Sequence, residues 1–330
     1  MDGASIKQEL ASLAERYGAW TDHNVRLTHN LYTMGETRRS AKLQRVVQIV
    51  CDLARKPIEE LRILDLACLE GGYAIEFARR GARTVGIEGR EQNIEKARFA
   101  QRVLGLSNLE LIRGDVRDLS IATHGTFDVV LCLGILYHLN APDVFSFLEA
   151  ISQVCTGLAV FDTYVALAPK QSYSYKGATY WGREFREHRL ELTEQERLAK
   201  SWASLDNLRS VWLTKRTLIN ILNRQGFTSV FECYVPLELT KPRDRVTMVA
   251  LKGRPARLMT NPTTIEHCGS EWPERLDNPP SHYQQGWANL SRAIVERLPR
   301  VPRQWLKQRL VSAGIIKPAS WGSVQTLRRR

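Results

Sequence analysis

Short apolar runs alternate with amphipathic segments from residue 61 onward. The runs at 62–67, 84–88, 109–112, 127–133 and 157–162 have the length and apolar character of buried parallel strands. The segments 71–80, 91–104 and 143–153 carry apolar residues at helical spacing. Strands separated by helices in this way predict an α/β fold, a parallel sheet with right-handed crossovers and helices on both faces.

The regions on either side of this pattern differ from it. Two helices, at 6–17 and 40–55, flank an irregular aromatic stretch, and we expect residues 1–60 to form an N-terminal helical lid. Residues 170–211 are polar and aromatic, and we expect them to be an inserted cap over the open end of the sheet. A helix at 214–225 and strands at 230–235 and 245–251 complete a domain spanning 61–253. We expect residues 254–330 to form an irregular, basic and partly helical C-terminal extension.

Composition narrows the class of protein. The chain has 330 residues, 43% of them apolar and 25% charged, which is ordinary for a globular protein. Charge throughout the first 16 residues argues against a secretory signal, and no run approaches the roughly 20 apolar residues of a membrane span. The six cysteines form no CxxC pair, which argues against a zinc knuckle or disulfide framework. We therefore expect a cytoplasmic protein without a metal site.

The positive charge is concentrated at the C-terminus. Residues 291–330 contain ten Lys or Arg against one Glu, which is +9 of the total net charge of +12. Within them, 302–311 fits a short basic amphipathic helix with Trp305, Leu306 and Leu310 on one side. Such a segment suits peripheral contact with an anionic membrane or docking on the protein itself. A solvated tail is the alternative, and RNA binding is less favoured because the body of the chain is nearly neutral.

Acidic residues follow three successive predicted strands. Asp65 ends the first, Glu88 ends the second and Asp115 follows the third. Open α/β sheets bind ligands outside the carboxyl ends of their strands, where an acid after the second strand can accept both hydroxyls of a ribose. Asp115 is placed to reach the exocyclic amine of adenine, and Gly71 lets the backbone approach a ligand closely. The pattern predicts a nucleoside-containing cofactor; unrelated loop acids are the alternative.

The charge of the loop after the first strand separates two cofactors. A dinucleotide needs its pyrophosphate at a glycine-rich turn before a helix. Glu70 lies in that place here and would repel a pyrophosphate, whereas it tolerates a cofactor that carries a sulfonium and an ammonium. S-adenosyl-L-methionine is therefore favoured over a nicotinamide cofactor.

Residues 62–139 resemble the class I S-adenosylmethionine-dependent methyltransferases, which have a Rossmann-like sheet. The stretch 65–71 resembles the family's glycine-rich first motif, although Ala67 and Leu69 stand where glycines are usual. Glu88 resembles the ribose-binding acid, and residues 133–139 resemble the segment after the fourth strand. The resemblance implies a cofactor site made of Asp65, Ala67, Gly71, Glu88, Asp115, Val116 and Leu133.

A narrower resemblance extends over residues 17–252. The stretches 20–35, 180–183 and 212–214 are similar to those of the group that contains the wobble-uridine tRNA carboxymethyl-transfer enzymes. That group also includes O-methyltransferases of small molecules, sugars and lipids, so the resemblance leaves the substrate open.

Methyl transfer to a hydroxyl needs an aligned acceptor and a base. His138, just past the fourth strand, is the first candidate base, and His23 and His29 in the lid are the others. The alternative role for each histidine is to hold its loop by hydrogen bonds to the backbone. Aromatic and cationic residues of the lid, the fourth-strand loop and the cap are candidates for substrate contact, with core packing as the alternative: Trp20, Tyr32, Tyr137, Tyr180, Trp181 and Arg183.

These observations predict an S-adenosylmethionine-dependent methyltransferase that acts on a hydroxyl of a small-molecule, sugar or lipid-linked acceptor. Two alternatives stay open. One is a tRNA-modifying methyl or carboxymethyl transferase, and the other is a protein that keeps the fold and binds without catalysis.

Overall fold

The computed structural model describes residues 2–35, 40–233 and 244–254. The predicted C-terminal extension lies outside the described residues except for its first position, so the basic tail and the domain boundaries stay predictions. Within the described part of the chain, no helix is long and apolar enough to cross a membrane. The cytoplasmic location stays a prediction.

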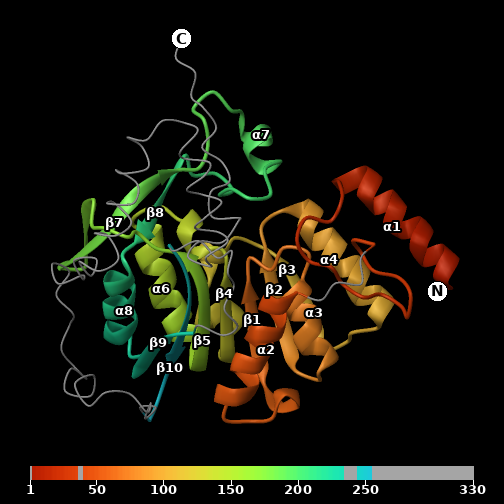
Figure 1. Cartoon of the computed structure of the whole chain (residues 1–330), viewed down its shortest axis with the longest axis horizontal. Coiled ribbons are helices and arrows are strands. Elements are labelled where there is room, and N and C mark those ends of the chain that lie inside the picture. Colours follow the sequence, from red (N-terminus) through yellow and green to blue (C-terminus); the bar gives the residue numbers. More distant parts are fainter. Residues whose placement is uncertain (1, 36–39, 234–243, 255–330) are drawn as a thin grey trace, which may run out of the picture. The chain divides into compact units, whose positions relative to one another are not determined.

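A seven-stranded sheet forms the centre of the fold (Figure 1). Its strands are β1 (Arg62–Leu66), β2 (Arg83–Glu88), β3 (Leu109–Arg113), β4 (Phe127–Leu133), β5 (Cys155–Tyr164), β9 (Ser229–Glu232) and β10 (Arg245–Leu251). They lie in the order β3-β2-β1-β4-β5-β10-β9, and β1 to β5 are parallel, whereas β10 is antiparallel to both neighbours. The predicted Rossmann-like fold is confirmed, and the strand order reverses between β1 and β4, where such sheets bind ligands.

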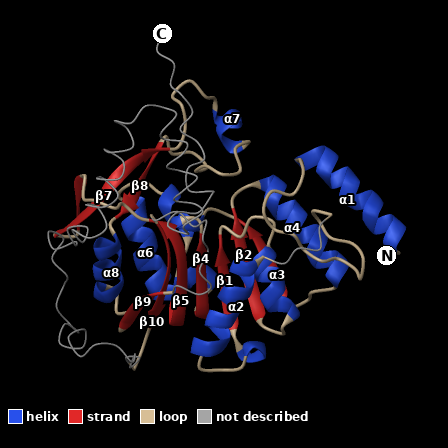
Figure 2. Ribbon diagram, viewed as in Figure 1, coloured by secondary structure: helices blue, strands red, loops and turns tan. Residues whose placement is uncertain are grey.

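Helices cover both faces of this sheet (Figure 2). They are α1 (Gly3–Tyr17), α2 (Ala41–Leu53), α3 (Gly72–Arg79), α4 (Glu91–Leu104), α5 (Ile121–His124), α6 (Asp143–Val154), α7 (Glu194–Leu198) and α8 (Lys215–Arg224), with single 3-10 turns η1 (Ile58–Glu60), η2 (Val116–Asp118) and η3 (Leu136–His138). One face packs on α2 and α3 and the other on α6 and α8. Because both faces are covered, Ile63 and Leu64 are both fully buried although they point to opposite sides.

The N-terminal segment is fixed to the body by a buried acid. The carboxylate of Glu70 is fully buried and accepts hydrogen bonds from the backbone N–H and the hydroxyl of Thr21, both at 2.7 Å. Lys96 lies 4.0 Å from this carboxylate and donates to the carbonyl of Ala19 at 2.8 Å. Glu70 therefore uses its charge to hold the N-terminal segment, which differs from the ligand-side position that the sequence suggested.

The inserted cap contains a sheet of its own, which the sequence did not predict. Its antiparallel strands are β6 (Gln171–Tyr175), β7 (Ala178–Arg186) and β8 (Arg209–Leu213). In Figure 1, β7 and β8 lie above α6 and α8. Tyr180 of β7 stacks on Phe145 of α6 with ring centroids 4.9 Å apart, so one face of this sheet is part of the main core.

Gly182 provides a test of the cap sheet. It pairs with Leu213, and a Cβ added to it would lie 2.5 Å from the carbonyl oxygen of Trp212, a backbone atom that cannot move freely. We expect Gly182→Ala to lower the free energy of unfolding by about 1–3 kcal/mol in urea titrations. Ser174→Ala on exposed β6 is the control and should change it by less than about 0.5 kcal/mol. Equal stability of the two variants would contradict the described pairing of β7 with β8.

Candidate active site

Asp65 is buried at the carboxyl edge of the sheet. The residue is 1% exposed, and its carboxylate accepts a hydrogen bond from the N–H of Ala74 at 3.1 Å, in the first turn of α3. Burial raises the pKa of Asp65 to about 7, the hydrogen bond from Ala74 opposes this rise, and the nearby carboxylate of Glu88 adds to it. No cation of the described chain is hydrogen-bonded or ion-paired to Asp65, so its charge is available to a positively charged ligand.

Glu88 links the ends of three segments. One carboxylate oxygen accepts the N–H of Leu69 at 3.0 Å, and the other accepts the N–H of Arg90 at 2.8 Å and the amide of Asn93 at 3.4 Å. Burial nevertheless raises the pKa of Glu88, because the residue is 2% exposed. The side-chain oxygen of Asn93 is buried without a partner in the described part of the chain, which leaves an acceptor beside Glu88 unused.

The loop between β1 and α3 adopts the shape that glycines favour although it lacks most of them. Ala67 and Leu69 have φ of 53° and 48°, and Gly71 has φ of 77°, all in the left-handed region. Non-glycine residues enter this region at a cost of roughly 1–2 kcal/mol each. Other residues therefore stand where the first motif usually has glycines, but the backbone keeps the left-handed conformation that glycine favours.

Asp115 caps η2 and is paired with Arg117. The guanidinium contacts one carboxylate oxygen of Asp115 at 2.9 and 2.5 Å, and the N–H of Arg117 donates to the other oxygen at 2.9 Å. Burial opposes ionisation, but these hydrogen bonds and the charge of Arg117 hold the pKa of Asp115 below its usual value. Val116 is buried beside Asp115, and Leu133 is half-buried at the end of β4.

His138 forms a pair with an acid of the cap. Its Nδ1 lies 2.9 Å from Glu187, whose side chain is 2% exposed. Glu187 also accepts the hydroxyl of Ser210 at 2.6 Å and the N–H of Ser204 at 3.0 Å. Although burial works against it, these bonds and the contact with His138 lower the pKa of Glu187. An ionised Glu187 requires a proton on Nδ1, so Nε2 keeps a lone pair, as a general base needs.

The other two candidate bases lack this arrangement. Nδ1 of His23 accepts the N–H of Gly72 at 2.9 Å, so neutral His23 carries its proton on Nε2 and has no free lone pair. Burial lowers the pKa of His23, although Glu70 and Asp22 oppose the shift. His29 is exposed and bonds its neighbour Asn30 at 2.5 Å. Among the three candidates, only His138 has both a free nitrogen and an orienting carboxylate.

An aromatic cluster lies next to His138. Tyr137 contacts the ring of Tyr164 at 4.9 Å and that of Trp212 at 6.3 Å. Tyr164 stacks on Trp212 at 4.7 Å, and the guanidinium of Arg183 lies 4.2 Å from the centre of the Trp212 ring. Two predicted substrate residues, Tyr137 and Arg183, are thus brought together with Tyr164 and Trp212, neither of which was predicted to contact substrate.

The other predicted substrate residues lie elsewhere. Trp20 is 6% exposed and packs on Phe99, and Tyr180 is 7% exposed in the main core, so packing accounts for both. Tyr32 lines a cavity of about 540 Å³ between the N-terminal segment and α3. Trp181 is half-buried on β7.

Another buried acid, Asp162, lies near the end of β5. Arg245 donates to it at 2.7 Å, Lys42 lies 3.0 Å away, and Thr247 donates at 3.0 Å. Burial opposes ionisation, but these cations hold the pKa of Asp162 below its usual value. No group of three or more potential metal ligands is found among the described residues.

Comparison with known proteins agrees with this geometry. Residues 63–157 match the model of the protein family described as methyltransferase domain. Residues 63–157 thus match a methyltransferase domain. The matched residues run from β1 to the start of β5, the part of the sheet that carries Asp65, Glu88 and Asp115.

The curated relatives that match the methyltransferase domain have different activities. A ubiquinone biosynthesis O-methyltransferase of Neisseria meningitidis is 35% identical over 105 residues, which are 32% of this chain and 42% of the relative. A tRNA U34 carboxymethyltransferase of Desulfotalea psychrophila is 30% identical over 159 residues, 44% of this chain and 46% of the relative. This chain thus spans less than half the length of both relatives.

Among solved structures, the N-terminal domain of EvdMO1, crystallised in the presence of S-adenosylhomocysteine and D-fucose, is similar to this chain. The match has a TM-score of 0.58 and 24% identity, and it covers 77% of this chain and 98% of that domain. It shows the shared fold.

The buried residues of the methyltransferase domain suit S-adenosylmethionine as the cofactor. Asp65 and Glu88 are buried acids with raised pKa, so a ligand that brings a cation relieves a cost that the protein alone carries. The unpartnered oxygen of Asn93 adds an acceptor beside Glu88.

The raised pKa of Asp65 can be tested by the pH dependence of stability. Because its pKa in the folded protein is about 7 and that of the unfolded chain is about 4, the folded state binds more protons between these values. The contribution of Asp65 to stability is therefore full below pH 4 and is lost as the pH rises to 7. We expect Asp65→Asn to raise the free energy of unfolding at pH 8, without cofactor, by on the order of 2–4 kcal/mol, and the gain to vanish near pH 4.

Asp128→Asn is the matched control in urea titrations at pH 8 and pH 5. Although burial opposes it, the contacts of Asp128 with Lys56 and with the N–H of Arg62 lower its pKa. Its contribution is present above the unfolded pKa and is lost as the pH falls through the folded pKa, so this variant should be less stable at pH 8. The same sign of change in both variants would refute the assignment for Asp65.

Proposed function

We propose that this protein is an S-adenosylmethionine-dependent O-methyltransferase whose acceptor is a hydroxyl of a sugar-containing molecule. The observation that carries the proposal is the pair of His138 and Glu187, which leaves a free Nε2 beside the edge of the sheet where the methyltransferase domain presents Asp65 and Glu88. The O-methyltransferase relatives and the D-fucose present with the EvdMO1 domain support the acceptor class.

Each residue of the proposed cofactor site would bind a different part of the cofactor. S-adenosylmethionine, when bound, supplies a methyl group that is activated because it is attached to a sulfonium. Glu88 would accept the ribose hydroxyls, Asp115 would lie on the adenine side, and Asp65 with the loop 67–71 would face the amino-acid part. Glu88 already accepts two backbone N–H groups, which fixes its carboxylate before any ligand arrives.

His138 completes the reaction. Its Nε2 would take the proton of the acceptor hydroxyl as the oxygen gains the methyl group that the cofactor supplies. The acceptor would leave as a methyl ether and His138 would be protonated. Glu187 is held ionised by its hydrogen bonds and stabilises the imidazolium, which is the role of the acid in such pairs.

The aromatic cluster supports a sugar as the acceptor. Trp212 is 7% exposed and stacks on both Tyr164 and Phe185, each with ring centroids 4.7 Å apart, and aromatic clusters of this kind are common in the walls of small-molecule sites. Nε1 of Trp212 and Nε of Arg183 are buried donors without a partner in the described structure. Buried donors normally have partners, so these two are candidates to bond acceptor hydroxyls once an acceptor opens the site.

The carboxymethyltransferase relative keeps RNA as a second candidate acceptor. That function predicts RNA binding that weakens steeply with salt and that is reduced when Arg328, Arg329 and Arg330 are removed. A protein that keeps the fold without catalysis is the third candidate; it predicts no turnover with any acceptor and weak binding of the cofactor.

Glu88→Ala tests the cofactor site. Calorimetric titration of S-adenosylhomocysteine should show binding by the wild type and a loss of about tenfold or more in affinity for the variant, because a charge-assisted bond to the ribose is removed. Glu95→Ala, which breaks a surface pair with Arg98 on α4, is the control and should bind like the wild type. Absence of binding by the wild type would refute the proposed function.

The base is tested by turnover on a panel of sugars that includes D-fucose. His138→Gln should lower kcat by roughly 10²–10⁴-fold, the usual contribution of a general base, with little change in cofactor affinity. Glu187→Gln should also lower kcat because the neutral amide no longer stabilises the imidazolium that forms on His138. His29→Gln, at the exposed site, should retain turnover. Wild-type turnover by His138→Gln would show that another group removes the proton.

A further inference from the structure

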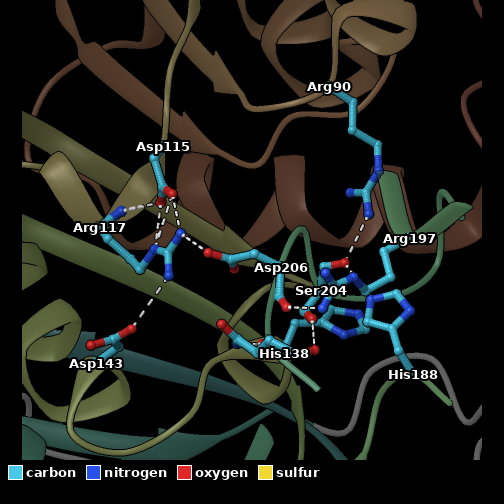
Figure 3. Close-up of polar contacts among 10 residues, drawn as sticks. Arg90, Asp115, Arg117, His138, Asp143, His188, Arg197, Ser204 and Asp206 are labelled. Atoms are coloured by element: carbon cyan, nitrogen blue, oxygen red, sulfur yellow. Dashed lines mark hydrogen bonds and ion pairs between the residues drawn. The ribbon is translucent and has the colours of Figure 1, made fainter. Parts of the chain in front are cut away.

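The segment 198–206 of the cap, which joins α7 to β8, is held by two arginines placed alike in the sequence. Arg90 stands two residues after Glu88, and Arg117 stands two residues after Asp115. Each uses its backbone N–H to bond the acid before it and its guanidinium to bond the cap segment. Figure 3 shows Arg90 extended toward Ser204, and Arg117 between Asp115 and Asp206.

The side chain of Arg90 is committed entirely to the cap segment. It donates to the carbonyl oxygens of Leu198 at 3.1 Å, Lys200 at 2.8 Å, Ala203 at 2.8 Å and Ser204 at 3.1 Å. The residue is 7% exposed, and burial lowers its pKa although Glu88 and Glu187 oppose the shift. A buried guanidinium that bonds four carbonyls fixes one conformation of the backbone it bonds.

The same segment lies against the backbone next to the ribose-binding acid. A Cβ added to Gly89 would lie 2.6 Å from Cδ1 of Leu205, so the Leu205 side chain is in contact with the residue that directly follows Glu88. Asp206 bonds Arg117 at 2.8 Å, on the guanidinium nitrogen that also holds Asp115. Leu205 and Asp206 therefore contact Gly89 and Arg117, residues that adjoin or bond the two acids assigned to the nucleoside.

We propose that the cap segment 198–206 forms a wall of the cofactor site on its adenosine side, with Leu205 in contact with the adenosine and with Arg90 and Arg117 as the residues that position it. The inference rests on the proposed function, because it takes Glu88 and Asp115 as the nucleoside acids. The N–H of Ser204 bonds Glu187, which in turn orients His138. One segment thus serves the cofactor wall and the catalytic base together.

The test is calorimetric titration of the full-length chain with S-adenosylhomocysteine and, separately, with methylthioadenosine, which keeps the adenosine and lacks the amino acid. Leu205→Ala should weaken both ligands by the same factor, about tenfold for the loss of one buried leucine side chain. Arg90→Gln should weaken both at least as much and speed release of S-adenosylhomocysteine in stopped-flow measurements. Arg102→Gln, which breaks the surface ion pair between Arg102 of α4 and Glu9 of α1, is the control.

The outcomes separate this inference from the function on which it rests. Wild type that binds both ligands, with Leu205→Ala and Arg90→Gln weakened alike for both, supports the wall. Unchanged affinity in Leu205→Ala and Arg90→Gln overturns it and leaves the cofactor site intact. Weaker S-adenosylhomocysteine with unchanged methylthioadenosine also overturns it, because the contact would then lie on the amino-acid side. Absence of binding by the wild type refutes the proposed function itself.

If Arg90→Gln fails to fold, hydrogen exchange of the wild type replaces it. Ligand binding should slow exchange of the backbone amides in 198–206, since the segment would be covered by adenosine and held more tightly. Exchange in this segment that is the same with and without S-adenosylhomocysteine would overturn the proposal, whatever the variants do.

Discussion

Uncompensated negative charge at the carboxyl edge of the sheet is the constraint on which the rest of this structure depends. Four strands end in or near an acid: Asp65, Glu88, Asp115 and Asp162. Two of them are neutralised by the protein, since Arg117 holds Asp115 and both Lys42 and Arg245 hold Asp162, and their pKa values are lowered. The other two, Asp65 and Glu88, are buried without a cation paired to their carboxylates and have raised pKa values. The unfavourable burial of these two carboxylates is left where a cationic ligand can compensate it. This distinguishes a binding site from a set of structural ion pairs.

The same constraint explains how distant segments come to this edge. Glu70, one position from Gly71, would add a fifth charge, but its carboxylate is bonded to Thr21 and lies near Lys96. The N-terminal segment is therefore attached at a buried acid. The cap is attached by the opposite charge, because Arg90 needs acceptors in a buried place and finds them in the cap carbonyls. The N-terminal segment and the cap are therefore held by the charged residues Glu70 and Arg90.

The sequence predicts the central sheet well and the cap poorly, for one physical reason. Strands buried on both faces are continuous apolar runs, so β1 to β5, β10 and the helix α4 follow from hydrophobicity. The strands β6 and β7 have exposed and half-buried positions throughout most of their length, and polar residues there hide the strand pattern. Glu187 follows β7 without a motif, and its pairing with His138 arises only when the chain folds. Trp20 and Tyr180 show the converse, because an aromatic in a family motif looks the same whether it serves the core or the ligand.

The loop 67–71 bears on whether the domain has kept its function. Loss of the usual glycines is what a decayed binding loop would show, and a chain without need of the ligand would relax to an unstrained path. Instead Ala67 and Leu69 keep left-handed φ values at a cost of roughly 1–2 kcal/mol each. The strain is maintained by bonds on either side, from the N–H of Cys68 to Ile87 at 3.0 Å and from the N–H of Leu69 to Glu88 at 3.0 Å. Strain held by the residue that would bind the ribose is strain in the binding site, and its retention favours a working cofactor site over an inherited fold.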